Sequence, residues 1–86
     1  MASIEEVKAG IAQAVDKVTE GGGKVQQTQA DYEAALAALQ QVTEGSGQAD
    51  VSTAAAQLQQ AIQLCGEAFQ SGEAGKQAAE AVAARL

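Results

Sequence analysis

Apolar residues recur along the chain at alternating intervals of three and four, the spacing of a helix that packs against another through one stripe. The series runs through both halves of the chain and predicts an all-α protein. We expect its larger members to form a coiled-coil-like seam: Ile4, Val7, Ile11, Val18, Val25, Tyr32, Leu39, Val42, Val51, Leu58, Ile62, Cys65, Phe69, Val82 and Leu86.

The first helix is predicted over about 3–44. It opens on Ser3-Ile4-Glu5-Glu6, a capping box in which Ser3 accepts from the Glu6 amide and Glu6 reaches back to the Ser3 amide. Three glycines at 21–23 interrupt it and cost roughly 3 kcal/mol of helix propensity relative to alanine. The spacing nevertheless keeps its phase across them, which favours one long helix with a weak point over two helices at about 3–20 and 25–44.

A second helix is predicted over about 50–85, after a turn at 45–49 that contains Gly45 and Gly47. Glycine after a helix C-terminus adopts the left-handed conformation that ends many helices. This helix has its own weak point at 71–75. We expect hinge positions in both helices, at Gly21, Gly22, Gly23, Gly72 and Gly75.

The two helices are predicted to fold into an antiparallel hairpin. If the chain folds back at residue 47, residue i lies near residue 94 − i, so Gly22 lies near Gly72 and the two glycine clusters meet at one height. The coincidence is consistent with a shared hinge, with close approach of the two backbones, or with chance among nine glycines.

Such a hairpin has a thin stripe and buries little by itself. Side chains beside the seam, at Val15 with Leu36 and at Ile62 with Phe69, widen the stripe beyond what the hairpin uses. We expect a second copy to cover them in a four-helix bundle. Small residues at alternate seam positions would allow close helix approach: Ala14, Ala35, Ala54, Ala61 and Ala68.

Charge narrows the range of partners. The net charge is −6, and the five basic residues are scattered singly, whereas nucleic acids and anionic membranes require clustered bases. No apolar run approaches the roughly 20 residues of a membrane span. The N-terminus has no basic stretch followed by an apolar one, the pattern of a cleavable secretory signal. We therefore expect a cytoplasmic protein, with export by a route that uses no cleavable signal left open.

The residues available for catalysis are few. The chain has no His and one Cys, so it lacks imidazole–nucleophile pairs and imidazole metal ligands. None of the eleven carboxylates occupies the seam, and we expect all of them on solvated faces. Cys65 lies between Ile62 and Phe69, where packing is the usual role of a thiol. The sequence predicts no catalytic residue, no cofactor and no metal site, and hence a protein that is not an enzyme.

An acidic chain of 86 residues, rich in Ala and Gln, with a small-residue turn at its middle resembles the ESAT-6/WXG100 proteins of type VII secretion. Its start, Met1-Ala2-Ser3-Ile4-Glu5-Glu6-Val7, and its turn, Glu44-Gly45-Ser46-Gly47-Gln48, are also similar to Ala-rich helical N-terminal modules of actinobacterial secreted toxins. The resemblance implies a non-enzymatic hairpin that dimerises and travels with, or marks, a secreted partner.

Two functions are consistent with these observations. The first is a protein–protein interaction module, a WXG100-like partner or adaptor that binds itself, a similar helical protein or a larger secreted protein. The second is a cytosolic structural protein that assembles into higher oligomers or filaments through its Gln-rich faces.

Overall fold

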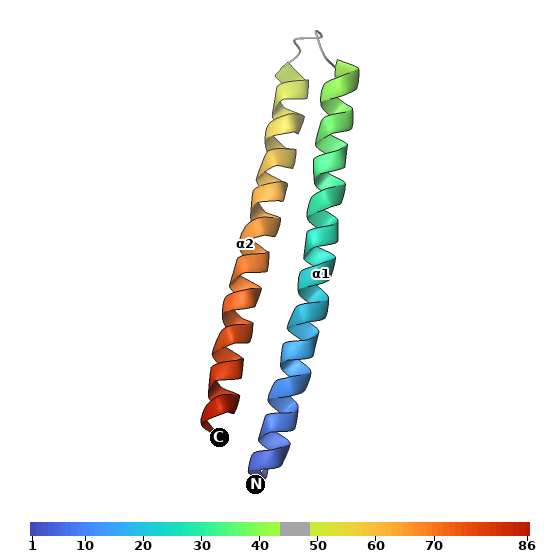
Figure 1. Ribbon diagram of the computed structural model, residues 1–86. Helices are drawn as coiled ribbons and strands as arrows, with labels where there is room; N and C mark the ends of the chain where they lie inside the picture. The colour runs from blue at the N-terminus through green and yellow to red at the C-terminus, as the bar shows by residue number, and fades with distance from the viewer. Residues whose placement is uncertain (44–48) are drawn as a thin grey trace.

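The computed structural model describes the backbone of residues 1–43 and 49–86 and the side chains of residues 1–42 and 51–86. Helix α1 spans Ile4–Thr43 and helix α2 spans Ala49–Arg85. The helices lie side by side and antiparallel, and both chain ends lie at the same end of the molecule (Figure 1). The predicted all-α helical hairpin is confirmed, whereas the turn predicted at Gly45 and Gly47 lies outside the described residues.

The start of α1 follows from its first residues. The Glu6 amide donates to Ser3 Oγ over 3.1 Å, and the Val7 amide donates to the Ser3 carbonyl over 3.0 Å. The other half of the predicted box differs, because the Ser3 hydroxyl itself donates to Glu6 Oε1 over 3.4 Å. The bond to Ser3 Oγ satisfies the Glu6 amide, which has no partner within the helix. The bond from the Val7 amide is the first bond of the helical series, which the carbonyl of an N-cap residue accepts.

Neither glycine cluster breaks its helix. Helix α1 continues through 21–23 and α2 continues through 71–75, so the structure has one long N-terminal helix and not the alternative pair. Helical propensity is a weak preference that packing overrides, and here both clusters lie where the two helices meet. The hinges proposed at these glycines stay a prediction.

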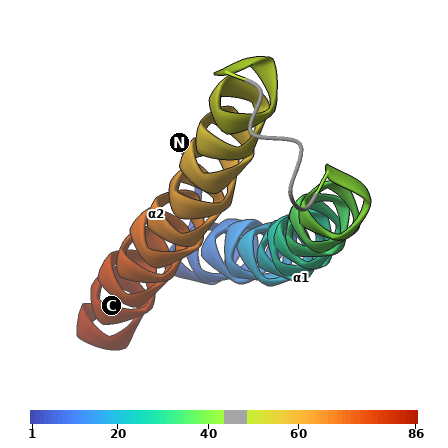
Figure 2. The ribbon, with the colours of Figure 1, turned by 90° about the horizontal axis from the view of Figure 1, so that it is seen from above.

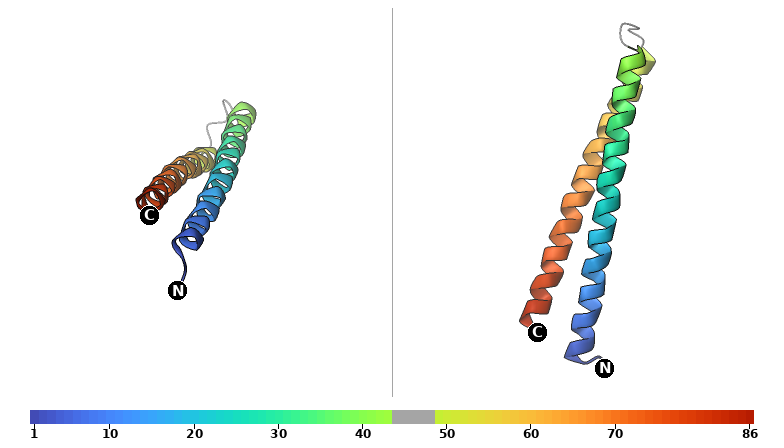
Figure 3. Two further views of the ribbon diagram at one scale, coloured as in Figure 1. Left: turned by 60° about the horizontal axis from the view of Figure 1, so that its bottom comes forward. Right: turned by 45° about the vertical axis from the view of Figure 1, so that its right-hand side comes forward.

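The hairpin is a single layer two helices wide, as the end-on view shows (Figure 2). Its extents are 64 × 18 × 14 Å and its radius of gyration is 19.3 Å, against about 12 Å for a compact domain of this length. The tilted views show the same two-helix layer from other sides (Figure 3). Among the described residues no side chain is fully buried, so the molecule lacks a closed core.

The seam between the helices includes many of the predicted residues and some others. The half-buried residues that were predicted are Ile11, Val18, Val25, Leu39, Val51, Leu58, Ile62, Cys65 and Phe69. The half-buried residues of α1 are Ile11, Val15, Val18, Gly21, Gly22, Val25, Gln29, Leu36 and Leu39. In α2 they include Leu58, Ile62, Cys65, Phe69, Gly72, Lys76, Ala79 and Ala83. The hairpin itself half-buries Val15, Leu36, Ile62 and Phe69, and the expectation that a second copy covers them further stays a prediction. Larger apolar side chains at these positions remove more area from water than alanine would.

Several predicted seam residues are exposed. Val42 is 80% exposed and Ile4 58%, so neither takes a substantial part in the contact between the helices. The other predicted seam residues that remain exposed are Val7, Tyr32, Val82 and Leu86. Val82 and Leu86 are exposed because, after Gly72, residues next to the predicted line face the other helix instead. These half-buried residues include Lys76 and Ala83.

The helices are also displaced along each other relative to the predicted register. A Cβ built on Gly22 lies 3.2 Å from Phe69 Cε2, and one built on Gly72 lies 3.7 Å from Val18 Cγ1. The residue numbers of these two pairs sum to 91 and 90, whereas the predicted register requires a sum of 94. The difference of three to four residues corresponds to about one helical turn. The physical reason is the Phe69 ring, which occupies the space that the missing side chain of Gly22 leaves.

Candidate interaction groove

Two adjoining hollows lie between the helices near the middle of the hairpin, and together they form what we call the groove. The first has a volume of about 240 Å³ and is lined by Val18, Gly21, Gly22, Val25, Ala68, Phe69, Gly72 and Glu73. The second has a volume of about 320 Å³ and is lined by Val25, Thr28, Tyr32, Ala61, Leu64, Cys65 and Ala68. Val25 and Ala68 line both, so the hollows are continuous.

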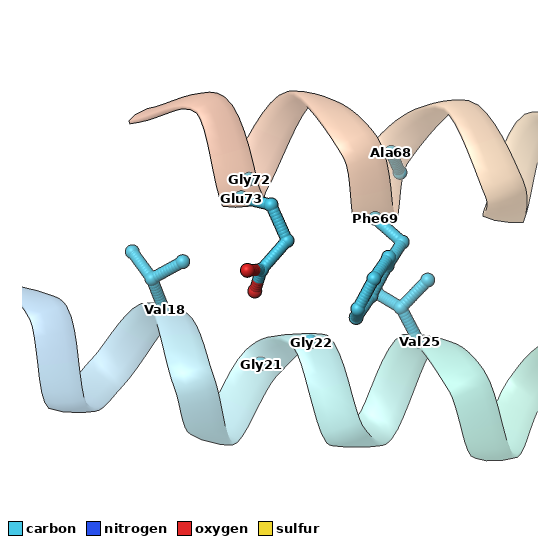
Figure 4. A pocket seen from close by; sticks show the side chains of 8 residues that line it. All are labelled: Val18, Gly21, Gly22, Val25, Ala68, Phe69, Gly72 and Glu73. Carbon is cyan, nitrogen blue, oxygen red and sulfur yellow. The ribbon is translucent and has the colours of Figure 1, made fainter. Parts of the chain in front are cut away.

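The first hollow exists because glycines stand on both sides of it. Phe69 projects from α2 toward α1 and lies over Gly22, beside Val25 (Figure 4). Gly21 has open space where its Cβ would be, and Gly72 faces Val18. The predicted meeting of the two glycine clusters therefore occurs with an offset of about one turn, and it produces a cavity beside a tightly seated ring.

Glu73 is the one charged residue in the lining of either hollow. Its side chain extends from α2 toward α1, between Val18 and Phe69 (Figure 4), and it is half-buried. The prediction that every carboxylate lies on a solvated face is wrong at this position. The physical reason is room, since Gly21 and Gly72 leave space that a flexible carboxylate side chain can enter.

The second hollow has a more bulky rim. Tyr32 is 38% exposed and Leu64 is 54% exposed. Both line the second hollow together with Thr28 and Ala61. Cys65 lies in the same lining as a half-buried free thiol. Exposed aromatic and aliphatic side chains at the edge of an apolar groove are typical of residues that anchor a partner.

Leu64 was not in the predicted seam. Its signal in the sequence is its spacing, three residues after Ala61 and four before Ala68, which places it on the same side of α2 as those two alanines. Gln29 was likewise expected on an outer face, yet it is half-buried and its Oε1 lies 4.0 Å from a Cβ built on Gly66.

The charged side chains that pair within α1 are exposed. Glu20 lies between two lysines, with Oε2 3.4 Å from Lys17 Nζ and Oε1 3.6 Å from Lys24 Nζ. Gln27 Nε2 donates to Asp31 Oδ1 over 3.4 Å. Since exposed pairs of this kind contribute about 0–1 kcal/mol, these side chains can change partners at little cost.

The described residues 1–43 and 49–86 contain no group of three or more Cys, Asp or Glu placed to hold a metal ion. Neither α1 nor α2, over the residues described, is long and apolar enough to cross a membrane. The feature that the structure does assemble from separate parts of the chain is the groove.

Comparison with known proteins adds no relative from which a function could be taken. No family model, no curated protein and no solved structure matches the chain.

Proposed function

We propose that the protein is a non-enzymatic protein–protein interaction module, and that the groove is the surface by which it binds a helical partner. The observation that carries the proposal is the continuous apolar groove, which no other element of the described chain covers. A helix or helix pair laid along it would bury the exposed side chains of Tyr32 and Leu64.

The surface area of the hairpin supports this function. The chain exposes 6145 Å², whereas a compact protein of 8.6 kDa exposes about 4,700 Å². The excess of about 1,400 Å² is larger than the roughly 800 Å² that each partner contributes to a stable interface of standard size. A binding partner would therefore supply the burial that the hairpin lacks by itself.

Two matched substitutions in α2 test the proposal. Ala68→Asp places a carboxylate where the two hollows join, while Ala74→Asp places one at an exposed position outside both linings. Both exchange the same residues in a helix interior, so their effects on helix propensity are similar. We expect Ala68→Asp to abolish association, measured by light scattering after size-exclusion chromatography, and Ala74→Asp to preserve it. An associated chain whose association both variants weaken equally would contradict a role for the groove.

A secretion-associated role is the specific form of this function that the resemblance to WXG100-like proteins favours. The chain has no Trp, so the Trp-x-Gly turn of that family has no counterpart here. Phe69 and Glu73, the nearest match to its Tyr-x-x-x-Asp/Glu export motif, lie within α2 and line the groove. This role predicts the full-length protein in the culture medium of the cells that encode it, and loss from the medium when their secretion ATPase is deleted.

Self-assembly into filaments is the second candidate. The exposed Gln-rich surface of a 64 Å rod offers contacts outside the groove, and a head-to-tail contact that does not close produces an open polymer. This function predicts a mass that grows without limit as concentration rises. A mass that stops at a fixed small multiple of the chain would contradict it.

A further inference from the structure

We propose that the partner in the groove is a second copy of this chain, packed antiparallel to the first about a two-fold axis that passes near Thr28 and Leu64. This inference rests on the proposed function and adds the identity of the partner and its register. Its argument is the self-complementarity of the groove in shape and in charge.

The shape argument begins with the two ends of the groove. One end carries the exposed side chain of Tyr32, and the other end has Gly21 and Gly22 in its lining. A two-fold axis across the groove places the bulky end of each copy on the hollow end of the other. Because such an interface is made by one surface twice, each complementary contact occurs twice.

We place the axis at the height that Thr28 and Leu64 share. Thr28 and Leu64 line the same hollow, and their numbers sum to 92, close to the 91 and 90 of the measured contacts. An axis that crosses α1 midway between residues 27 and 28, at position 27.5, brings residue i of one copy to the height of residue 55 − i of the other. Tyr32 then reaches the height of residue 23, beside Gly21 and Gly22. At 1.5 Å per residue, the offset between that height and Gly22 is about 1.5 Å.

The same axis aligns opposite charges. Lys24 and Asp31 lie on one line of α1, seven residues apart, at the edge next to Gly21 and Thr28. They are equally distant from 27.5, so Lys24 of each copy meets Asp31 of the other. Lys17 reaches the height of Ala38, which is uncharged, so no like charge opposes it.

In α2 the axis passes close to Leu64, which would meet its own counterpart. The neighbouring positions on that line of α2 are Gln57 and Ser71, which are uncharged and lie at matching heights on the two copies. The half-exposed Leu64 side chain would thereby become the apolar centre of the contact. Glu20 and Gln27, the present partners of Lys24 and Asp31, lie in the same helix and lose only weak exposed contacts.

Charge reversal tests the register. Lys24→Glu or Asp31→Lys alone replaces two attractive contacts by two repulsive ones, and we expect the dissociation constant of the dimer to rise about tenfold or more. The double variant Lys24→Glu/Asp31→Lys restores both pairs and should return the constant to within about threefold of the starting value. Lys17→Glu is the matched control and should leave it nearly unchanged. Additive losses in the double variant would overturn the proposed register.

Disulfide trapping tests the position of the axis independently. In a Cys65→Ser background, Leu64→Cys should form a disulfide-linked dimer on mild oxidation, because the two copies of position 64 face each other. Ala78→Cys lies on the same line of α2 and should form no disulfide. It stands 14 positions beyond the axis, so its counterpart in the antiparallel copy lies the same distance beyond the axis on the other side. Circular dichroism verifies that each variant is helical, and linking at 78 but not at 64 would overturn the arrangement.

The mass of the unmodified chain separates the two proposals. If Ala68→Asp dissociates the dimer but charge reversal does not weaken it, the groove is the interface and the proposed register is wrong. A helical monomer at several hundred micromolar overturns the second copy as partner, while the groove would remain available to a different helical protein.

Discussion

At the residue scale, the contact between Gly22 and Phe69 determines how the helices register. The ring lies so close to Gly22 that a Cβ there would stand 3.2 Å from Phe69 Cε2, tighter than most side-chain contacts. Gly23, the next residue, has open space around its Cβ position. Two adjacent glycines in one helix therefore have different roles, since only Gly22 is needed for packing.

We predict opposite outcomes for alanine at these two positions. Gly23→Ala should raise the free energy of unfolding by roughly 0.8–1.0 kcal/mol, because alanine favours the helix. Gly22→Ala gains the same propensity but displaces the Phe69 ring, so its net effect should be smaller than that of Gly23→Ala or negative. Thermal denaturation followed by circular dichroism measures both.

A double variant provides the control for this contact. If the ring is what opposes alanine at position 22, then in a Phe69→Ala background Gly22→Ala should stabilise by the same amount as Gly23→Ala. An unchanged deficit at position 22 would mean that another contact explains it.

The Ser3 cap is a second contact at this scale. Ser3→Ala removes the acceptor of the Glu6 amide and should cost about 1 kcal/mol of helix stability, seen as faster hydrogen exchange in the first turn of α1. Ser71→Ala, in the interior of α2, is the matched control and should slow exchange or leave it unchanged. Equal exchange in the two variants would argue against the cap.

At the element scale, each helix has two neighbouring lines of apolar residues with different tasks. One line forms the seam within the hairpin, and the other borders the groove. Ile62 and Leu64 represent the two lines, since Ile62 is half-buried between the helices while Leu64 is 54% exposed at the groove rim.

An aspartate at each position separates these tasks. Ile62→Asp should lower helicity at every concentration, because burying part of an unpaired carboxylate between the helices destabilises the hairpin. Leu64→Asp should retain the helicity of the hairpin and lose association. Far-ultraviolet circular dichroism together with light scattering distinguishes them, and unfolding of Leu64→Asp in dilute solution would contradict its placement at the rim.

The helical hairpin and the continuity of α1 through 21–23 could be predicted from the spacing of apolar residues alone. The choice between adjacent lines could not, because Ala14 with Val15 and Ala61 with Ile62 offer two stripes of compatible period. The structure half-buries Val15 and leaves Ala14 exposed, whereas it half-buries both Ala61 and Ile62. That choice depends on the area each side chain buries against the other helix, which spacing does not encode.

The groove was harder to predict than the fold. The meeting of Gly22 with the Gly72 region followed from simple hairpin geometry, but its offset of one turn depends on where the Phe69 ring fits. Glu73 lines the first hollow against expectation, because its burial depends in part on Gly21, which is distant in the sequence and lies on the other helix. Leu64 is not part of the predicted seam. Its place at the rim of the groove is apparent only from the structure, in which it lines the second hollow together with Tyr32.

At the scale of the whole molecule, the hairpin is a thin rod without a closed core. Its radius of gyration of 19.3 Å and the lack of any fully buried side chain among the described residues imply low stability for an isolated copy. The association that we propose would stabilise the fold through mass action, so stability and the fraction of associated chain should rise together with concentration.

The most direct test of the groove as an interface is the mass of the unmodified chain in solution as a function of concentration, measured by sedimentation equilibrium. We predict a transition from 8.6 kDa to twice that value and no further, with a parallel gain in melting temperature. Leu64→Asp should remain at the single-chain mass throughout. A chain of unchanged mass at every concentration, or a Leu64→Asp variant that dimerises as well as the original, would contradict this account.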